Sequence, residues 1–140
     1  MPEILSRSLK NIILKIILKI IKMSCLFDSL STFTKGLTSF ELRQAICDYL
    51  ETNPLLMDDL TAESVINSEN GLSLVDYVRT MRGQNTMGGA IEIRAFINIF
   101  KINIRVKSLP NQRNIEFLFN NQNPWREIVW TGGHFDPVIN

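Results

Sequence analysis

Three residues of this chain have the types and the order that thiol catalysis uses. Cys25 lies in the first fifth of the 140-residue chain, His134 is its only histidine, and Asp136 follows two residues later. A thiol is a weak nucleophile until a base takes its proton, and imidazole can act as that base near neutral pH. Cys25 and His134 are therefore candidates for a nucleophile and its general base.

The residues after Cys25 predict a short helix, because apolar side chains recur there at helical spacing: Leu26, Phe27, Leu30 and Phe33. Cys25 would lie at the N-terminus of this helix, where unpaired N–H groups and the helix dipole favour the thiolate. The alternative is a small buried apolar residue, since free cysteine is among the most buried residue types. For His134 and Asp136 the alternatives are an exposed loop histidine and a turn carboxylate.

Length and charge limit the possible classes of function. The chain has the size of one ordinary domain and can bury about two-thirds of its unfolded surface. Its 15 basic and 14 acidic residues leave a net charge of +1, which gives no electrostatic basis for binding nucleic acid. Two cysteines form no disulfide framework and no secretory cleavage pattern is visible. We therefore expect an intracellular, cytoplasmic protein, in a host cell if its source is a virus or a bacterium.

Residues 1–22 form an apolar segment interrupted by lysines. Its polar residues share one stripe of a helix: Asn11, Lys15, Lys19 and Lys22. In an extended conformation, alternate residues from Ile12 to Ile20 would all point one way, so helix and strand both stay open. The segment is too short and too charged to span a bilayer. We expect it to pack on the domain, and peripheral contact of residues 4–22 with a membrane surface is the alternative.

Several helices are predicted in the middle of the chain. One begins at Thr38 or Ser39, which can cap it, and ends at Asn53-Pro54. This helix contains Cys47, which we interpret as a core residue. A short helix is expected around 60–66, before the turn at Asn70-Gly71.

Two more helices precede a series of strands. The first of the two ends at Gly83, with an inner face of Leu72, Leu74, Val75, Val78 and Met81. The second spans 90–100, with Ile91, Ala95, Phe96, Ile97 and Ile99 buried. Alternating apolar residues then predict strands over 102–107, 115–119, 128–130 and 135–139, the first two as a hairpin. Helices followed by strands indicate an α+β fold, with a helical layer on a small, mostly antiparallel sheet.

Three blocks of this chain resemble the OTU (ovarian tumour) family of papain-like cysteine proteases, which remove ubiquitin or related modifiers from proteins. The blocks are Cys25-Leu26-Phe27 with Ser29-Leu30-Ser31, Met87-Gly88-Gly89-Ala90-Ile91-Glu92-Ile93 leading into Ile102–Val106, and His134-Phe135-Asp136. The segment Leu42-Arg43-Gln44-Ala45-Ile46 is also similar to the family's helix after the nucleophile. The resemblance covers residues 23–140, and it implies a papain-like OTU fold for them.

The resemblance implies a role for each matched residue. Cys25 would be the nucleophile, His134 the general base and later acid, and Asp136 the group that orients the imidazole, because residues two apart on a strand point to the same side. Backbone N–H groups of Met23, Ser24 and Cys25 would bind the oxyanion. The last group of matched residues would bind the extended tail of the modifier: Gly88, Gly89 and Phe135. No metal and no cofactor are implied.

The chain departs from the family pattern directly before the nucleophile. The family commonly has Asp-Gly-X-Cys there, whereas this chain has Lys22-Met23-Ser24-Cys25. Without the glycine, the oxyanion loop could fail to form. Met87 stands where tryptophan is frequent, and residues 1–22 have no family counterpart. The expected function is a thiol-dependent isopeptidase acting on ubiquitin or a ubiquitin-like protein, and the alternative is a weak or inactive module that binds a modifier without cleaving it.

Overall fold

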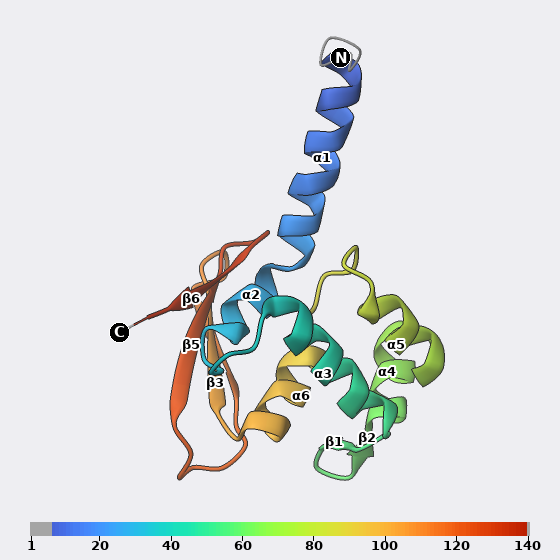
Figure 1. The fold of residues 1–140 in the computed structure, drawn as a ribbon. Coiled ribbons are helices and arrows are strands. Elements are labelled where there is room, and N and C mark those ends of the chain that lie inside the picture. The colour runs from blue at the N-terminus through green and yellow to red at the C-terminus, as the bar shows by residue number, and fades with distance from the viewer. Residues whose placement is uncertain (1–6, 140) are drawn as a thin grey trace.

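The computed structural model describes residues 7–139, and for residues 19–22 it describes the backbone alone. The helices are α1 (Arg7–Met23), α2 (Cys25–Ser31), α3 (Ser39–Glu51), α4 (Ala62–Asn70), α5 (Leu74–Arg82) and α6 (Ala90–Phe100). The strands are β1 (Leu55–Met57), β2 (Leu60–Thr61), β3 (Asn103–Ser108), β4 (Arg113–Phe117), β5 (Trp125–Trp130) and β6 (Phe135–Val138). Helices α2 to α6 lie on one side of a four-stranded sheet (Figure 1). The α+β fold predicted from the sequence is confirmed.

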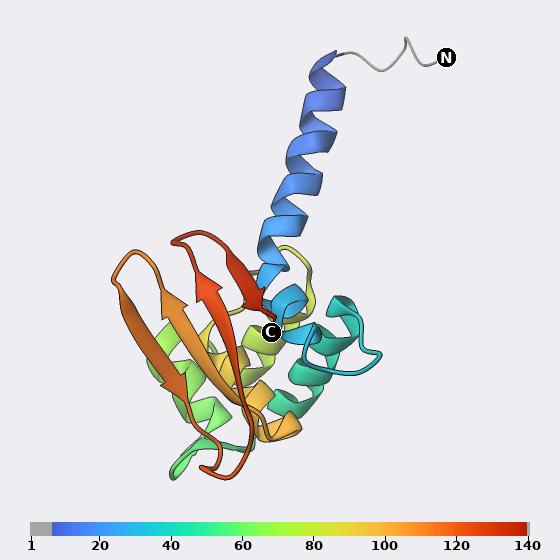
Figure 2. The ribbon, with the colours of Figure 1, turned by 90° about the vertical axis from the view of Figure 1, so that its left-hand side faces the viewer.

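The larger sheet has the strand order β4-β3-β5-β6. The pairs β3–β4 and β5–β6 are antiparallel, whereas β3 and β5 run parallel with Val106 opposite Ile128. The sheet is therefore mostly antiparallel, as predicted, and β6 forms one of its edges (Figure 2). The predicted hairpin is the β3–β4 pair, but the small β1–β2 sheet was not predicted because its strands are too short to show a period.

The loop between β4 and β5 is tied to the sheet by one buried side chain. The Asn103 amide nitrogen donates to the carbonyls of Asn120 and Asn123 at 2.8 and 3.0 Å, and its oxygen accepts from the N–H of Phe119 at 2.6 Å and of Asn120 at 3.2 Å. A buried amide with both ends satisfied is stabilising, whereas an unpaired one is costly. This loop can therefore turn the chain so that β5 aligns parallel to β3.

The core lies between the helices and the sheet. Its fully buried members come mainly from α2, α3, α4, α6 and the central strands, and include Phe27, Leu42, Ile46, Ile66, Phe96, Ile104 and Ile128. Helix α3 begins as predicted, since Thr38 accepts from the N–H of Glu41 and Glu41 accepts from the N–H of Thr38. Cys47 is fully buried in this helix, and its interpretation as a core residue is confirmed.

For some elements, the side chains predicted to face the core were the wrong ones. Leu72 lies in the loop before α5 and is exposed, as is Val75 of α5. Tyr77 is buried instead, because its hydroxyl reaches the buried Glu92 carboxylate at 2.6 Å. In α6, Ile91 and Ile99 are only partly buried, and Ile93 is among the residues that take the inner positions. Ile115 of β4 is exposed near the edge of the sheet. Helix propensity and residue spacing therefore predicted where the elements lie along the chain better than they predicted which side of each element faces the core.

The N-terminal segment is a helix rather than a strand from Arg7 onward, and residues 1–6 lie outside the described part of the chain. Helix α1 projects from the body of the protein and meets it at its C-terminal end, beside α2 and Arg43 of α3 (Figures 1 and 2). The expectation that this segment packs on the domain is wrong for Arg7 to Leu18, whose side chains are exposed.

A single arginine connects three segments around α2. Arg43 of α3 is 1% exposed and donates from Nη1 to the carbonyls of Met81 and Thr86, each at 2.9 Å, and from Nη2 to the carbonyl of Met23 at 3.0 Å. Its guanidinium lies 4.1 Å from the centre of the Phe27 ring. A planar fork of donors suits several acceptors at once, which a lysine could not match.

Replacing Arg43 should destabilise the fold strongly. Arg43→Met leaves three carbonyls without their donor, and we expect it to lower the free energy of unfolding by about 3 kcal/mol, measured by urea denaturation. The matched control is Arg79→Met, which removes an exposed arginine paired with Asp76, and it should change the stability by less than about 1 kcal/mol. Equal effects of the two substitutions would contradict a special role for Arg43.

Candidate active site

Helix α2 and strand β6 bring together residues from opposite ends of the chain. Cys25 is the first residue of α2, Phe135 is the first residue of β6, and the Phe135 N–H donates to the Cys25 Sγ at 3.4 Å. His134 precedes Phe135 directly, so the candidate base lies in the same part of the structure as the candidate nucleophile. The contact spans 110 positions of the sequence.

His134 and Asp136 form a pair beside this contact. The Nε2 of His134 lies 3.0 Å from the Oδ1 of Asp136, and both side chains are about half exposed. An ionised carboxylate can only accept, so it favours the tautomer with the proton on Nε2. The lone pair is then on Nδ1, the nitrogen that remains available to receive a proton from a thiol. The predicted orienting role of Asp136 fits this geometry.

The turn before β6 holds His134 through its backbone. The carbonyl of His134 accepts from the N–H of Thr131 at 2.9 Å and from the Thr131 hydroxyl at 3.2 Å. Within this turn Gly132 has a φ of 106°, a value that favours glycine over residues with a Cβ. Gly132 therefore serves the tight turn that leads into β6.

The thiol of Cys25 is buried, which changes its expected ionisation. Cys25 is 1% exposed, and this burial raises its pKa, although N–H groups of Phe135 and Leu26 act in the opposite direction. The sequence predicted a pKa lowered by the helix N-terminus, so burial outweighs that effect here. Burial also raises the pKa of the Cys47 thiol, to about 11. At neutral pH, Cys25 therefore needs a base to become a thiolate.

The three predicted oxyanion donors have different surroundings. Met23 is the last residue of α1, where the N–H of an α-helical residue points to the carbonyl four positions earlier. The Met23 carbonyl accepts from Arg43, and the next N–H, that of Ser24, points the opposite way because the peptide is planar and trans. Cys25 lies in the first turn of α2, whose N–H groups have no partner within that helix. In this conformation Met23 is thus a helical residue rather than part of an open oxyanion loop.

The two glycines before α6 differ in what surrounds them. A Cβ on Gly88 would lie 2.8 Å from Leu26 and 2.9 Å from Phe27, so glycine is required there for close packing against α2. A Cβ on Gly89 would meet nothing within 4 Å, and the Gly89 N–H donates to Glu92 at 2.7 Å. Of the pair, Gly89 has the open space that a bound peptide would need.

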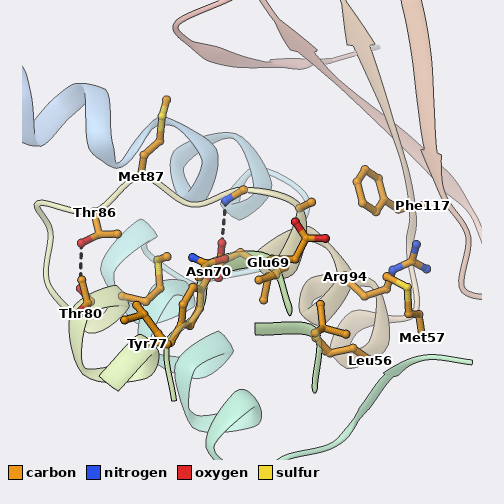
Figure 3. Close-up of a pocket in the computed structure, with 17 residues that line it drawn as sticks. Leu56, Met57, Glu69, Asn70, Tyr77, Thr80, Thr86, Met87, Arg94 and Phe117 are labelled. Carbon is orange, nitrogen blue, oxygen red and sulfur yellow. Dashed lines mark hydrogen bonds between the residues drawn. The ribbon is translucent and has the colours of Figure 1, made fainter. Parts of the chain in front are cut away.

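Gly89 is one of the residues that line a cavity of about 370 Å³ (Figure 3). The other lining residues come mainly from α4, α5, α6 and the ends of β1 and β4, and include Leu56, Met57, Tyr77, Met87, Arg94 and Phe117. The lining is largely apolar with one cation, since the Arg94 guanidinium lies over the Phe117 ring at 5.3 Å. The cavity could receive apolar side chains of a bound peptide.

Phe135 contributes its ring and its backbone N–H to different surroundings. Its ring is buried, with its centre 4.6 Å from that of Trp130. The side chain therefore belongs to the packing beneath β6, and the backbone N–H is the part that reaches the sulfur. Phe135 also lines a small apolar pocket of about 160 Å³ together with Ala90 and Trp130, and its assignment to binding the substrate tail stays a prediction.

Sequence reasoning missed two buried groups that support the site. Arg43 fixes the carbonyl before Ser24, and Glu92 fixes the N–H of Gly89. Burial raises the pKa of Glu92, against the hydrogen bonds from Tyr77 and Gly89. The available signal was a charged residue within an otherwise apolar helical face, in α3 and in α6. Among residues 7–139, no group of three or more potential metal-binding side chains is found.

The chain shares its fold with solved OTU domains. It is 21% identical to an ovarian tumour domain in complex with ubiquitin, with a TM-score of 0.65, covering 81% of this chain and 62% of that one. It is 17% identical to the viral OTU protease of Qalyub virus, with a TM-score of 0.63 and coverages of 83% and 79%. An OTU deubiquitinase of Wolbachia pipientis wMel is 18% identical, with a TM-score of 0.61 and coverages of 85% and 83%.

This chain therefore spans less than two thirds of the first of these structures. No curated protein sequence matches it significantly. The family described as OTU-like cysteine protease matches residues 24–131, which is more than half of the 140 residues. The match begins directly before Cys25 and runs from α2 through β5, and it ends at Thr131, before His134 and β6. The chain belongs to the OTU-like cysteine protease family.

Proposed function

We propose that this protein is a thiol-dependent isopeptidase that removes ubiquitin or a ubiquitin-like modifier from other proteins. The observation that supports this most directly is the contact between the Phe135 N–H and the Cys25 sulfur, beside the His134–Asp136 pair. Membership of the family supports the same activity. The solved OTU structures with bound ubiquitin make ubiquitin the first partner to test.

The proposed reaction passes through a thioester. His134 takes the proton of the Cys25 thiol, the sulfur attacks the carbonyl carbon of the scissile bond, and the C–N bond breaks as the imidazolium returns that proton to the leaving amine. A water molecule, deprotonated by His134, then attacks the thioester. The C–S bond breaks and the sulfur regains a proton. Asp136 keeps the imidazole oriented with Nε2 protonated throughout.

We propose that the C-terminal tail of the modifier runs past Gly89. The lack of any atom within 4 Å of a Cβ at this residue leaves room for a second backbone. The neighbouring apolar cavity would accept side chains of the modifier, with Arg94 at one end for a carbonyl or a carboxylate. Because the Cys25 sulfur is nearly sealed, substrate entry requires the residues covering the thiol to move.

Covalent labelling tests the proposed nucleophile. Ubiquitin with a C-terminal electrophile should form an adduct with the full-length protein, visible as a mass increase, because the tail delivers the electrophile to the thiolate. Cys25→Ala should form no adduct. Cys47→Ala is the matched control and should still be labelled, since Cys47 is a core residue. An intact protein that resists labelling by ubiquitin and ubiquitin-like probes would contradict the proposal.

The pH dependence of alkylation tests the proposed base. Burial raises the pKa of the Cys25 thiol, so without a base the thiolate fraction at neutral pH is small and grows about tenfold per pH unit until that pKa is reached. In His134→Ala, the rate of Cys25 alkylation by iodoacetamide should therefore rise only at higher pH than in the unmodified protein. At pH 7 it should be at least about tenfold slower.

The alkylated residue is identified by peptide mass mapping. Cys47 provides an internal control, because its pKa of about 11 and its full burial should keep it unmodified over the neutral range. Superimposable pH profiles for the two proteins would show that His134 does not take the proton of Cys25.

A second candidate function is a module that binds a modifier with little or no turnover. The position of Met23 within α1 favours this candidate, because the family's glycine loop is replaced there by a helix end. Binding of ubiquitin would then rely on the surface around Gly89 and not on a competent oxyanion site. The raised pKa of Cys25 is consistent with a poorly reactive thiol.

Restoring the family sequence before Cys25 separates the two candidates. If Met23 limits the reaction, Lys22→Asp with Met23→Gly should free the oxyanion loop and raise the turnover of di-ubiquitin by about a hundredfold, the contribution of one oxyanion donor. The control variant, Lys15→Asp with Ile16→Gly, introduces the same two residues nearer the N-terminus of α1 and should leave turnover unchanged. Efficient cleavage by the unmodified protein would exclude the second candidate.

A further inference from the structure

Helix α1 carries a large apolar surface away from the body of the protein. Ile12, Ile13, Ile16 and Ile17 are between 42% and 54% exposed, and they lie on the part of the helix that projects into solvent (Figures 1 and 2). Isolated exposed apolar residues are ordinary, but a contiguous set of this kind marks an interaction surface. The catalytic chemistry proposed above makes no use of it.

The charge of α1 has one sign. Its sequence holds Arg7, Lys10, Lys15, Lys19 and Lys22 and has no aspartate or glutamate between Arg7 and Met23. Asn11 and Lys15 are one turn apart and belong to a polar stripe along the helix. Isoleucine and leucine occupy the wider arc beside this stripe. An amphipathic helix with lysines beside a broad apolar face fits the interface of an anionic bilayer, where the apolar side chains enter the lipid and the ammonium groups remain at the headgroups.

Two other occupants fit this surface less well. A second copy of the helix would carry five further positive charges and no acidic side chain within α1, so no ion pair between the two helices could fix their pairing. A bilayer-spanning arrangement is not supported either, since none of the helices described in the structure is long and apolar enough to cross a membrane. Binding parallel to the membrane surface remains as the arrangement that satisfies both the apolar arc and the charge.

We propose that α1 attaches this protein to the surface of membranes rich in anionic phospholipid, with its Ile12-Ile13-Ile16-Ile17 face in the lipid. Ser24 alone separates the end of α1 from Cys25, so the attached protein holds its candidate nucleophile beside the bilayer. The substrates favoured by this arrangement are modified proteins on the same membrane. The attachment itself does not depend on isopeptidase activity.

Vesicle sedimentation of the full-length protein tests the attachment. It should sediment with vesicles of equal parts phosphatidylserine and phosphatidylcholine, much less with phosphatidylcholine alone, and less as salt is raised. Lys10→Gln with Lys15→Gln should weaken partitioning about 25-fold, at about fivefold per lysine near an anionic surface. Lys10→Arg with Lys15→Arg keeps both charges and should bind like the unmodified protein.

The apolar face is tested separately. Ile13→Gln with Ile17→Gln should abolish sedimentation, whereas Val75→Gln, at a 64% exposed position of α5, should leave it unchanged. Circular dichroism and size-exclusion chromatography without lipid accompany each variant. Equal binding to both vesicle types, unaltered binding of either double glutamine variant, or a lipid-free dimer that the isoleucine substitutions dissociate would overturn the proposal.

Discussion

The contact between the start of α2 and the start of β6 is the constraint on which this molecule depends. One backbone N–H, that of Phe135, meets the Cys25 sulfur, and the residues on either side of Phe135 are the candidate base and its orienting carboxylate. A helix from the beginning of the chain and an edge strand from its other end must therefore pack to within a hydrogen-bond length. The remaining elements hold these two in place: α3 packs on α2 and on α6, and β5 pairs with β6.

Arg43 shows how the fold supports the site from behind. Its guanidinium fixes the carbonyl before Ser24, the end of α5 and the loop that leads to the two glycines. The same burial that makes these hydrogen bonds strong would make them costly to lose. The geometry around Cys25 is thus determined by a residue that touches neither the sulfur nor the cavity beside Gly89.

The sequence allowed much of the fold to be predicted, and less of the site. Helix ends were predicted well at Thr38, whose side chain caps the start of α3, and at Gly83, which directly follows α5, because these signals are local. The orientation of α5 was not predicted correctly, because Tyr77 pairs with Glu92, a residue in another helix. The order of Cys25, His134 and Asp136 indicated a site. The burial of the thiol and the helical state of Met23 arise from packing between distant segments, which no local pattern reveals.

The edge position of β6 has a consequence during synthesis on the ribosome. Most of the core, including α2, α3, α6 and the β3–β4 hairpin, lies in the polypeptide made before His134 emerges. Until β6 joins the sheet, the nascent protein has a thiol but neither its base nor the N–H that faces the sulfur. If the chain is a protease, its hydrolytic capacity is then absent from every incomplete translation product and begins only when this edge strand docks.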